Sequence, residues 1–178
     1  MSFLCGMQPE KFPAMVLVEA LGPFSSPPPE FPKQFRQFLT AREHGKTKEM
    51  PHYPSFERAV EARLTVGGMR RSSVEILCER GLREVPGGFT WRSDSRLRLP
   101  SPFRLSEEHI LATLGEITCP TLLMRGLSGM DFPEPGFSER KKAIRNLSEA
   151  IIDGGHHLHL DEPEAAAIPV RDFLRKFL

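Results

Sequence analysis

The sequence lacks the features that mark several large classes of protein. None of its apolar runs reaches the roughly 20 residues that a membrane-spanning helix needs, and no charged segment followed by a long apolar one marks a signal peptide. The formal net charge is only +1, so no basic excess indicates a nucleic acid or an acidic membrane surface as the main partner. We therefore expect a protein with no membrane span and no nucleic-acid partner.

Cysteine is scarce as well. The three cysteines, Cys5, Cys78 and Cys119, lie far apart in the sequence and do not have the spacing of a zinc site. An odd number of cysteines favours reduced thiols, and hence a reducing compartment. The sequence accordingly predicts a cytoplasmic protein, and it indicates no metal or other cofactor.

The remaining composition is that of an ordinary globular protein, with 39% hydrophobic and 26% charged residues. The length of 178 residues fits one domain with a substantial core. Four arginines gather between residues 92 and 104, interrupted by acidic residues and prolines: Arg92, Arg96, Arg98 and Arg104. We interpret this cluster as a solvated face.

Three short apolar runs predict buried strands, at residues 14–18, 119–124 and 149–152. Continuous apolar runs bounded by turn residues are typical of strands covered on both faces, as in a parallel sheet. Helical patterns follow the second and the third run, at residues 138–147 and 165–178, and Pro163 stands in the first turn of the last helix. This alternation predicts an α/β fold.

The segment after the first strand has a different character. A stiff linker, Ser25-Ser26-Pro27-Pro28-Pro29, leads into several helical patterns without β-α alternation, apart from a short extended piece at residues 89–91. The sequence therefore predicts a helical insertion. Its aromatic residues either line a substrate wall or form the core of the insertion: Phe31, Phe35, Phe38, Phe89 and Trp91.

The stretch from Asp153 to Glu164 organises the rest of the chain. An apolar run enters it, two glycines turn the chain, and His156 follows at once, before Pro163 and Glu164 open the closing helix. Three readings are open. The histidines can be solvated residues of a turn, or His156, His157 and His159 can bind a metal, although two neighbours and an i, i+2 pair do not close a site. The third reading, His156 as a general base, is what the family resemblance described next implies.

Together these stretches resemble the C-terminal half of an α/β-hydrolase with an inserted helical cap. Pro9-Glu10-Lys11-Phe12 before residues 15–19, Ile117-Thr118-Cys119-Pro120-Thr121-Leu122-Leu123, and Gly155-His156 with Pro163-Glu164 match the approaches to the last three strands. Within the superfamily, the serine hydrolase-like proteins are the best match. The resemblance implies a partial α/β-hydrolase fold, with a three-stranded parallel sheet, core residues 1–23 and 116–178, and a cap at residues 24–115.

The resemblance also implies a Ser-His-acid triad with His156 as general base and His157 and His159 as neighbours without that role. The acid commonly follows the second of these strands, but that position is Gly129, which has no carboxylate. Two candidates remain. Asp131 lies two residues further on, and Glu19 directly follows the first strand, as the acid does in some haloalkane dehalogenases. We favour Glu19.

The nucleophile of the superfamily lies in a Gly-x-Ser-x-Gly turn, and the chain contains no such motif. We therefore expect the chain to be the C-terminal portion of a serine hydrolase, truncated ahead of Met1, whose serine lies upstream and whose substrate is a small ester-like molecule. The alternative is a non-catalytic product or pseudoenzyme that acts only by binding. Alone, the chain should be inactive and should self-associate through the exposed edge of residues 15–18.

Overall fold

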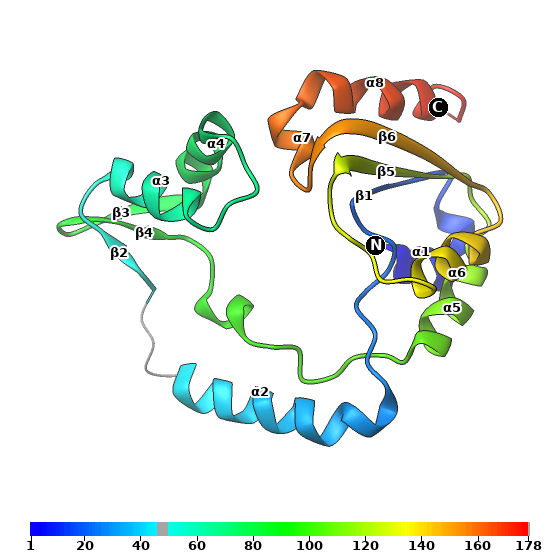
Figure 1. Cartoon of the computed structure of the whole chain (residues 1–178), viewed down its shortest axis with the longest axis horizontal. Helices are drawn as coiled ribbons and strands as arrows, with labels where there is room; N and C mark the ends of the chain where they lie inside the picture. The colour runs from blue at the N-terminus through cyan, green and yellow to red at the C-terminus, as the bar shows by residue number, and fades with distance from the viewer. Residues whose placement is uncertain (46–49, 178) are drawn as a thin grey trace. The chain divides into compact units, whose positions relative to one another are not determined.

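The structure, a computed structural model, describes residues 1–45 and 50–177. It divides into two compact units, one formed by Met1–Pro28 with Arg104–Leu178 and the other by Pro29–Phe103. Each unit has its own sheet and its own apolar core (Figure 1). In the described ranges, no helix combines the length and the apolar character that crossing a membrane requires.

The first unit is built on the predicted three-stranded parallel sheet. Its strands are β1 (Met15–Val18), β5 (Thr121–Ser128) and β6 (Leu147–Gly155), in the order β1-β5-β6. Met15 lies opposite Thr121, which in turn lies opposite Leu147, so the three strands start level with one another. Because the strands are parallel, their carboxyl ends point to the same end of the sheet, where the residues that follow them can meet.

Helices cover both faces of this sheet (Figure 1). Leu123 packs in a cluster with residues of α1 (Ser2–Met7), α5 (Glu107–Gly115) and α6 (Gly136–Ala143). The next residue, Met124, packs on the other face against α7 (Leu158–Asp161) and α8 (Pro163–Leu174). Successive side chains of a strand point to opposite faces, which explains why β1 and residues 122–124 of β5 are apolar without alternation.

Helix α5 belongs to the unit of the parallel sheet, although the sequence assigns it to the insertion. Ile110 and Leu114 lie four residues apart, on one face of the helix, and both are fully buried in the core of the first unit. The units therefore divide at Pro28–Pro29 and at Phe103–Arg104.

The second unit contains the predicted helices and a sheet that the sequence did not predict. Its helices are α2 (Phe31–Gly45), α3 (Phe56–Leu64) and α4 (Arg71–Gly81). Strands β2 (His52–Tyr53), β4 (Gly88–Trp91) and β3 (Leu82–Val85) pair antiparallel, in that order. The insertion therefore carries a small antiparallel sheet beside its helices, and β4 overlaps the short extended piece expected at residues 89–91. In the described residues, short 3₁₀ turns lie at Pro9–Lys11, Pro28–Glu30 and Ser95–Arg98.

Candidate active site

Glu19 directly follows β1 and is buried, with 3% of its surface exposed. Its backbone has a φ of +50°, a left-handed conformation that is uncommon for a residue other than glycine. The two carboxylate oxygens accept hydrogen bonds from different backbone groups, Oε1 from the amide of Gly126 and Oε2 from the amide of Met130, both at 2.6 Å. Hydrogen bonds of this kind stabilise a buried carboxylate in its charged form.

His156 directly follows β6, at the same edge of the sheet. Its Nδ1 lies 3.4 Å from Oε2 of Glu19. When the proton is on Nδ1, the ring donates to the carboxylate, and the lone pair of Nε2 is free to accept a proton. The buried Glu19 carboxylate contacts the ring at Nδ1. The side chain of His156 is nevertheless 45% exposed, so solvent or a substrate can reach it.

The two other histidines of the stretch lie beside this pair. The ring of His157 lies 4.8 Å from that of His156, and the ring of His159 lies 6.3 Å from that of His157. His159 is exposed to solvent. Within the described part of the chain, no three histidine, cysteine or acidic side chains are grouped so that they could hold a metal ion.

Of the two candidate acids, the structure brings Glu19 to His156. Asp131 lies in the loop between β5 and α6 with its side chain exposed. Among residues 1–45 and 50–177, the close contact of the His156 ring with a carboxylate is made with Glu19 and not with Asp131. The roles of these residues in catalysis stay predictions.

Gly129 explains how Glu19 fits at this position. A Cβ atom at residue 129 would overlap both carboxylate oxygens of Glu19 and stand 2.6 Å from its Cδ. Any side chain at this position would therefore displace the acid. In the sequence, Gly129 stands out only because it lacks the carboxylate expected at that position. In the structure, its missing side chain leaves the space that the Glu19 carboxylate occupies.

A cavity of about 600 Å³ opens next to the pair and lies entirely in the first unit. Both Glu19 and His156 line it. Its other walls are mostly apolar and aromatic, with three charged side chains among them: Leu21, Phe24, Met130, Phe132, Phe137, Arg104, Glu107 and Arg140. A concave, mostly apolar space with a few polar groups is typical of a small-molecule site.

One wall of the cavity is fixed by Arg140 of α6. Its guanidinium forms a two-pronged ion pair with Glu107 of α5, with N–O distances of 2.6 and 2.7 Å. It also donates to the carbonyl oxygens of Leu21 and Pro23, at 2.9 and 2.8 Å. These hydrogen bonds fix the position of Leu21 and Pro23, which follow Glu19 in the chain. The ion pair with Arg140 lowers the pKa of the Glu107 carboxyl below its usual value.

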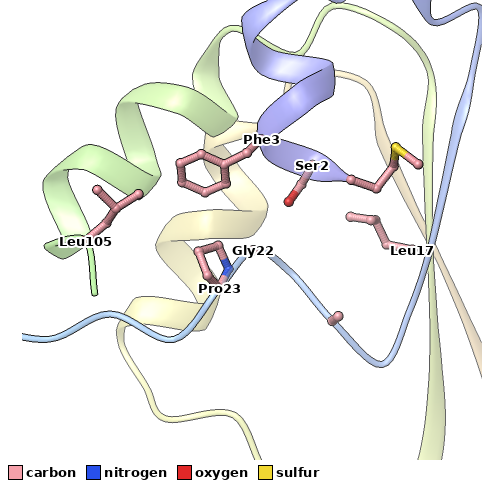
Figure 2. A pocket seen from close by; sticks show the side chains of 8 residues that line it. Ser2, Phe3, Leu17, Gly22, Pro23 and Leu105 are labelled. Atoms are coloured by element: carbon pink, nitrogen blue, oxygen red, sulfur yellow. The ribbon is translucent and has the colours of Figure 1, made fainter. Parts of the chain in front are cut away.

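A second cavity, of about 500 Å³, shares Ala20, Gly22 and Pro23 of its lining with the first. Figure 2 shows Phe3 of α1, Leu17 of β1 and Leu105 around it. Its lining includes no charged side chain.

The aromatic residues of the insertion make contacts within the second unit. Phe31 and Phe35 lie 5.7 Å apart between ring centroids, and the Trp91 indole donates to the hydroxyl of Tyr53 at 3.3 Å. Phe89 and Trp91 pack on the core of that unit. The aromatic wall beside His156 comes instead from Phe132 and Phe137, which sequence reasoning missed because both lie in a loop-and-helix segment without a motif.

Comparisons with known proteins agree with this architecture. No protein-family model matches the chain. The chain is 30% identical over 129 residues to a serine hydrolase-like protein of Danio rerio, a match that covers 68% of the chain and 39% of that protein. It is also 30% identical to a probable serine hydrolase of Drosophila melanogaster, over 62% of the chain and 35% of that protein. The chain thus spans well under half the length of these curated relatives.

Among solved structures, a hypothetical protein from Pseudomonas aeruginosa PAO1 matches 99% of the chain with 36% identity and a TM-score of 0.88, over 62% of its own length. A thioesterase domain from the curacin biosynthetic pathway matches 94% of the chain with a TM-score of 0.74, over 59% of its own length. Its identity is 23%, so this second likeness concerns the fold alone.

Proposed function

This chain belongs to the α/β-hydrolase superfamily, and we propose that it supplies the general base and the acid of a Ser-His-acid triad that acts on a small ester-like substrate. The observation that carries the proposal is the contact of His156 with the buried Glu19, 3.4 Å from Nδ1 to Oε2, beside a cavity of about 600 Å³. A titratable pair at the edge of an apolar cavity is what general-base chemistry requires.

In this proposal Glu19 orients His156 and stabilises the imidazolium that forms during the reaction. Nε2 of His156 accepts the proton of the serine hydroxyl as the serine attacks the carbonyl carbon of the substrate. The same proton then passes to the leaving alcohol. The acyl group remains on the serine until a water molecule, deprotonated by His156 in the same way, releases it.

The serine of this triad lies outside the 178 residues, because the sequence has no Gly-x-Ser-x-Gly turn. We infer that the pair works with a segment of the full-length protein that carries this turn. Without it, the chain supplies a base and a cavity but neither a nucleophile nor an oxyanion hole, which together provide most of the rate. The alternative, a chain that acts only by binding, gives the opposite outcome in the following experiment.

The experiment places a hydrolase-derived segment with one strand and a Gly-x-Ser-x-Gly turn ahead of Met1 and follows hydrolysis of p-nitrophenyl acetate. We expect the chain alone to act no faster than free imidazole and the fusion to be active. His156→Ala should lower kcat of the fusion by at least about a thousandfold, whereas His159→Ala, the matched control, should leave it unchanged. A folded fusion that is inactive, or equally active with His156→Ala, would favour the binding-only alternative.

A further inference from the structure

We propose that the cavity beside His156 recognises an anionic oxygen group on the substrate, a carboxylate or a sulfate-like group, and that Arg104 is the residue that binds it. This assignment names a substrate class for the proposed hydrolase and rests on that function for its biological meaning. The binding itself needs no nucleophile, so it can be tested on the chain as it stands.

The argument begins with the charges that line the cavity. Both oxygens of Glu19 are engaged by backbone amides, at 2.6 Å each. Arg140 has its nitrogens committed to Glu107 and to two carbonyl oxygens. These three side chains are fixed parts of the wall: the charges of Arg140 and Glu107 compensate each other, and the carboxylate of Glu19 faces His156.

Arg104 differs from them. Its guanidinium lies 5.9 Å from the ring centroid of Phe24, another residue of the cavity wall, and its side chain is exposed. Within residues 1–45 and 50–177, no carboxylate forms an ion pair with it. A guanidinium that rests on an aromatic face keeps its in-plane N–H groups available. Arg104 therefore contributes an uncommitted positive charge at the cavity.

The backbone around Arg104 is held in place. The carbonyl of the next residue, Leu105, accepts a hydrogen bond from the amide of Ser26 at 3.0 Å, and the Leu105 side chain packs on the core of the first unit. Helix α5 begins two residues later, at Glu107. The base of the arginine side chain is therefore positioned before a ligand arrives, which lowers the entropy lost on binding.

The wall around this charge suits a hydrocarbon chain. Phe132 and Phe137 stack with their ring centroids 4.5 Å apart, and the guanidinium of Arg125 lies 5.3 and 4.7 Å from the two centroids, which buttresses the pair. A substrate that fits has an apolar segment against these rings and an anionic end at Arg104. The planar fork of an arginine binds carboxylate and sulfate oxygens in pairs.

The test compares three probes that share one hydrocarbon: 4-phenylbutyrate, 4-phenylbutanesulfonate and the neutral 4-phenylbutyramide. Each is titrated into the ¹⁵N-labelled chain, with the amide signals of Phe132, Phe137 and Ala20 as reporters. We expect at least one anion to bind about tenfold more tightly than the amide. Whether the carboxylate or the sulfonate binds better decides which of the two groups the substrate carries.

Variants assign the preference to Arg104. Arg104→Gln should remove the difference between anion and amide without changing binding of the amide, and Arg104→Lys should retain part of it. Arg98→Gln removes another arginine of the same sequence cluster, but one that lies in the second unit. It should leave the binding of all three probes unchanged. Equal binding of all three probes, no binding of any, or an equal loss for all three with Arg104→Gln would each overturn the proposal. The fusion experiment above fails or succeeds independently, because it reads out His156 and not Arg104.

Discussion

At the scale of single residues, the site depends on one carboxylate placed by segments far apart in the sequence. The left-handed backbone of Glu19 costs roughly 1–2 kcal/mol relative to an ordinary conformation. Two short hydrogen bonds, from Gly126 and Met130, offset this cost because charge-assisted bonds are the stronger kind. The strain thus occurs at the residue that contacts His156, which is where functional strain is commonly found.

The space at Gly129 gives a test at this scale. Gly129→Ala should lower the free energy of unfolding by about 1–3 kcal/mol, as overpacking does, because the new methyl group overlaps the Glu19 carboxylate. It should also shift the ¹⁵N signal of His156 Nδ1, which loses its partner. Both effects are measured by urea unfolding and by NMR of the imidazole nitrogens.

Gly115→Ala is the matched control, since a Cβ atom there meets nothing within 4 Å. Gly115 is the last residue of α5, and alanine in a helix is more stable than glycine by roughly 0.5–1 kcal/mol. We expect this variant to be as stable as the original chain or slightly more so. Equal behaviour of the two variants would contradict the role assigned to Gly129.

The sequence was informative about the site where the local pattern decides the position. His156 could be placed because a strand, two glycines and a helix fix where one residue lies. Glu19 remained one of two acids, because the choice depends on the end of β5 and the loop that follows it, whose amides at Gly126 and Met130 reach Glu19 across more than 100 positions. The role of Gly129 could not be predicted from the sequence, since it depends on the Glu19 carboxylate that lies beside it in the folded chain.

At the scale of elements, the contact of α5 with α6 depends on a partly buried ion pair. Arg140 and Glu107 have exposed side-chain fractions of only 14% and 29%, and the arginine also holds the segment of Leu21 and Pro23. This ion pair needs the charged form of the Glu107 carboxyl, because the hydrogen bonds from Arg140 are the main cause of its lowered pKa. The packing of these helices should therefore depend on pH.

The sign of this dependence follows from the lowered pKa. A carboxyl whose pKa is lower in the folded state stabilises the fold above its ordinary pKa, 4.5, and loses that contribution as the pH falls through the folded value. Urea unfolding of the chain and of Glu107→Gln should show a stability difference that is constant near pH 7 and shrinks below about pH 4.5. In an Arg140→Gln background this pH dependence should be largely lost. A difference that stays constant down to pH 3 would contradict the assignment.

Elements were predictable from periodicity, and the failures have local causes. Strand β3 was missed because Leu82 follows the last residue of α4, Gly81, without a turn between them. A Cβ at Gly81 would stand 2.7 Å from the Trp91 ring, so this glycine lets β4 pack closely where the helix ends.

The contact of Cys5 with Cys119, 3.5 Å between sulfurs, is likewise invisible in a sequence that separates them by 114 positions. Burial is the main reason that the pKa of the Cys5 thiol is raised to about 12.

At the scale of the whole molecule, the parallel sheet has an open edge at β1. The strand pairs only with β5, because the order of the described strands is β1-β5-β6. The amides of Met15 and Glu19 donate to carbonyls on the β5 side. In a parallel strand alternate residues bond to opposite sides, so the amides of Val16 and Val18 face the open edge. Such an edge is a template for another strand.

Apolar residues next to this edge increase its tendency to associate. The side chains of Met1, which precedes α1, and of Leu4 and Met7 on α1 are 78%, 50% and 69% exposed, and exposed apolar surface of this kind favours protein contacts. We expect two copies of the chain to pair β1 with β1 around a two-fold axis, which makes each edge the partner of the other. Sedimentation velocity over a range of micromolar concentrations should then show reversible association.

Val16→Pro tests the edge directly, because proline removes the outward amide but leaves the hydrogen bonds to β5 in place. We expect this variant to be folded by circular dichroism and to sediment mainly as a monomer. Val16→Ala removes more of the apolar side chain than Val16→Pro does but keeps the amide, so it should associate nearly as well as the original chain if the amide decides the pairing. If the original chain is instead a monomer with one cooperative thermal transition, the edge is guarded by the chain itself, and the parallel sheet with its helices closes a core without a further strand.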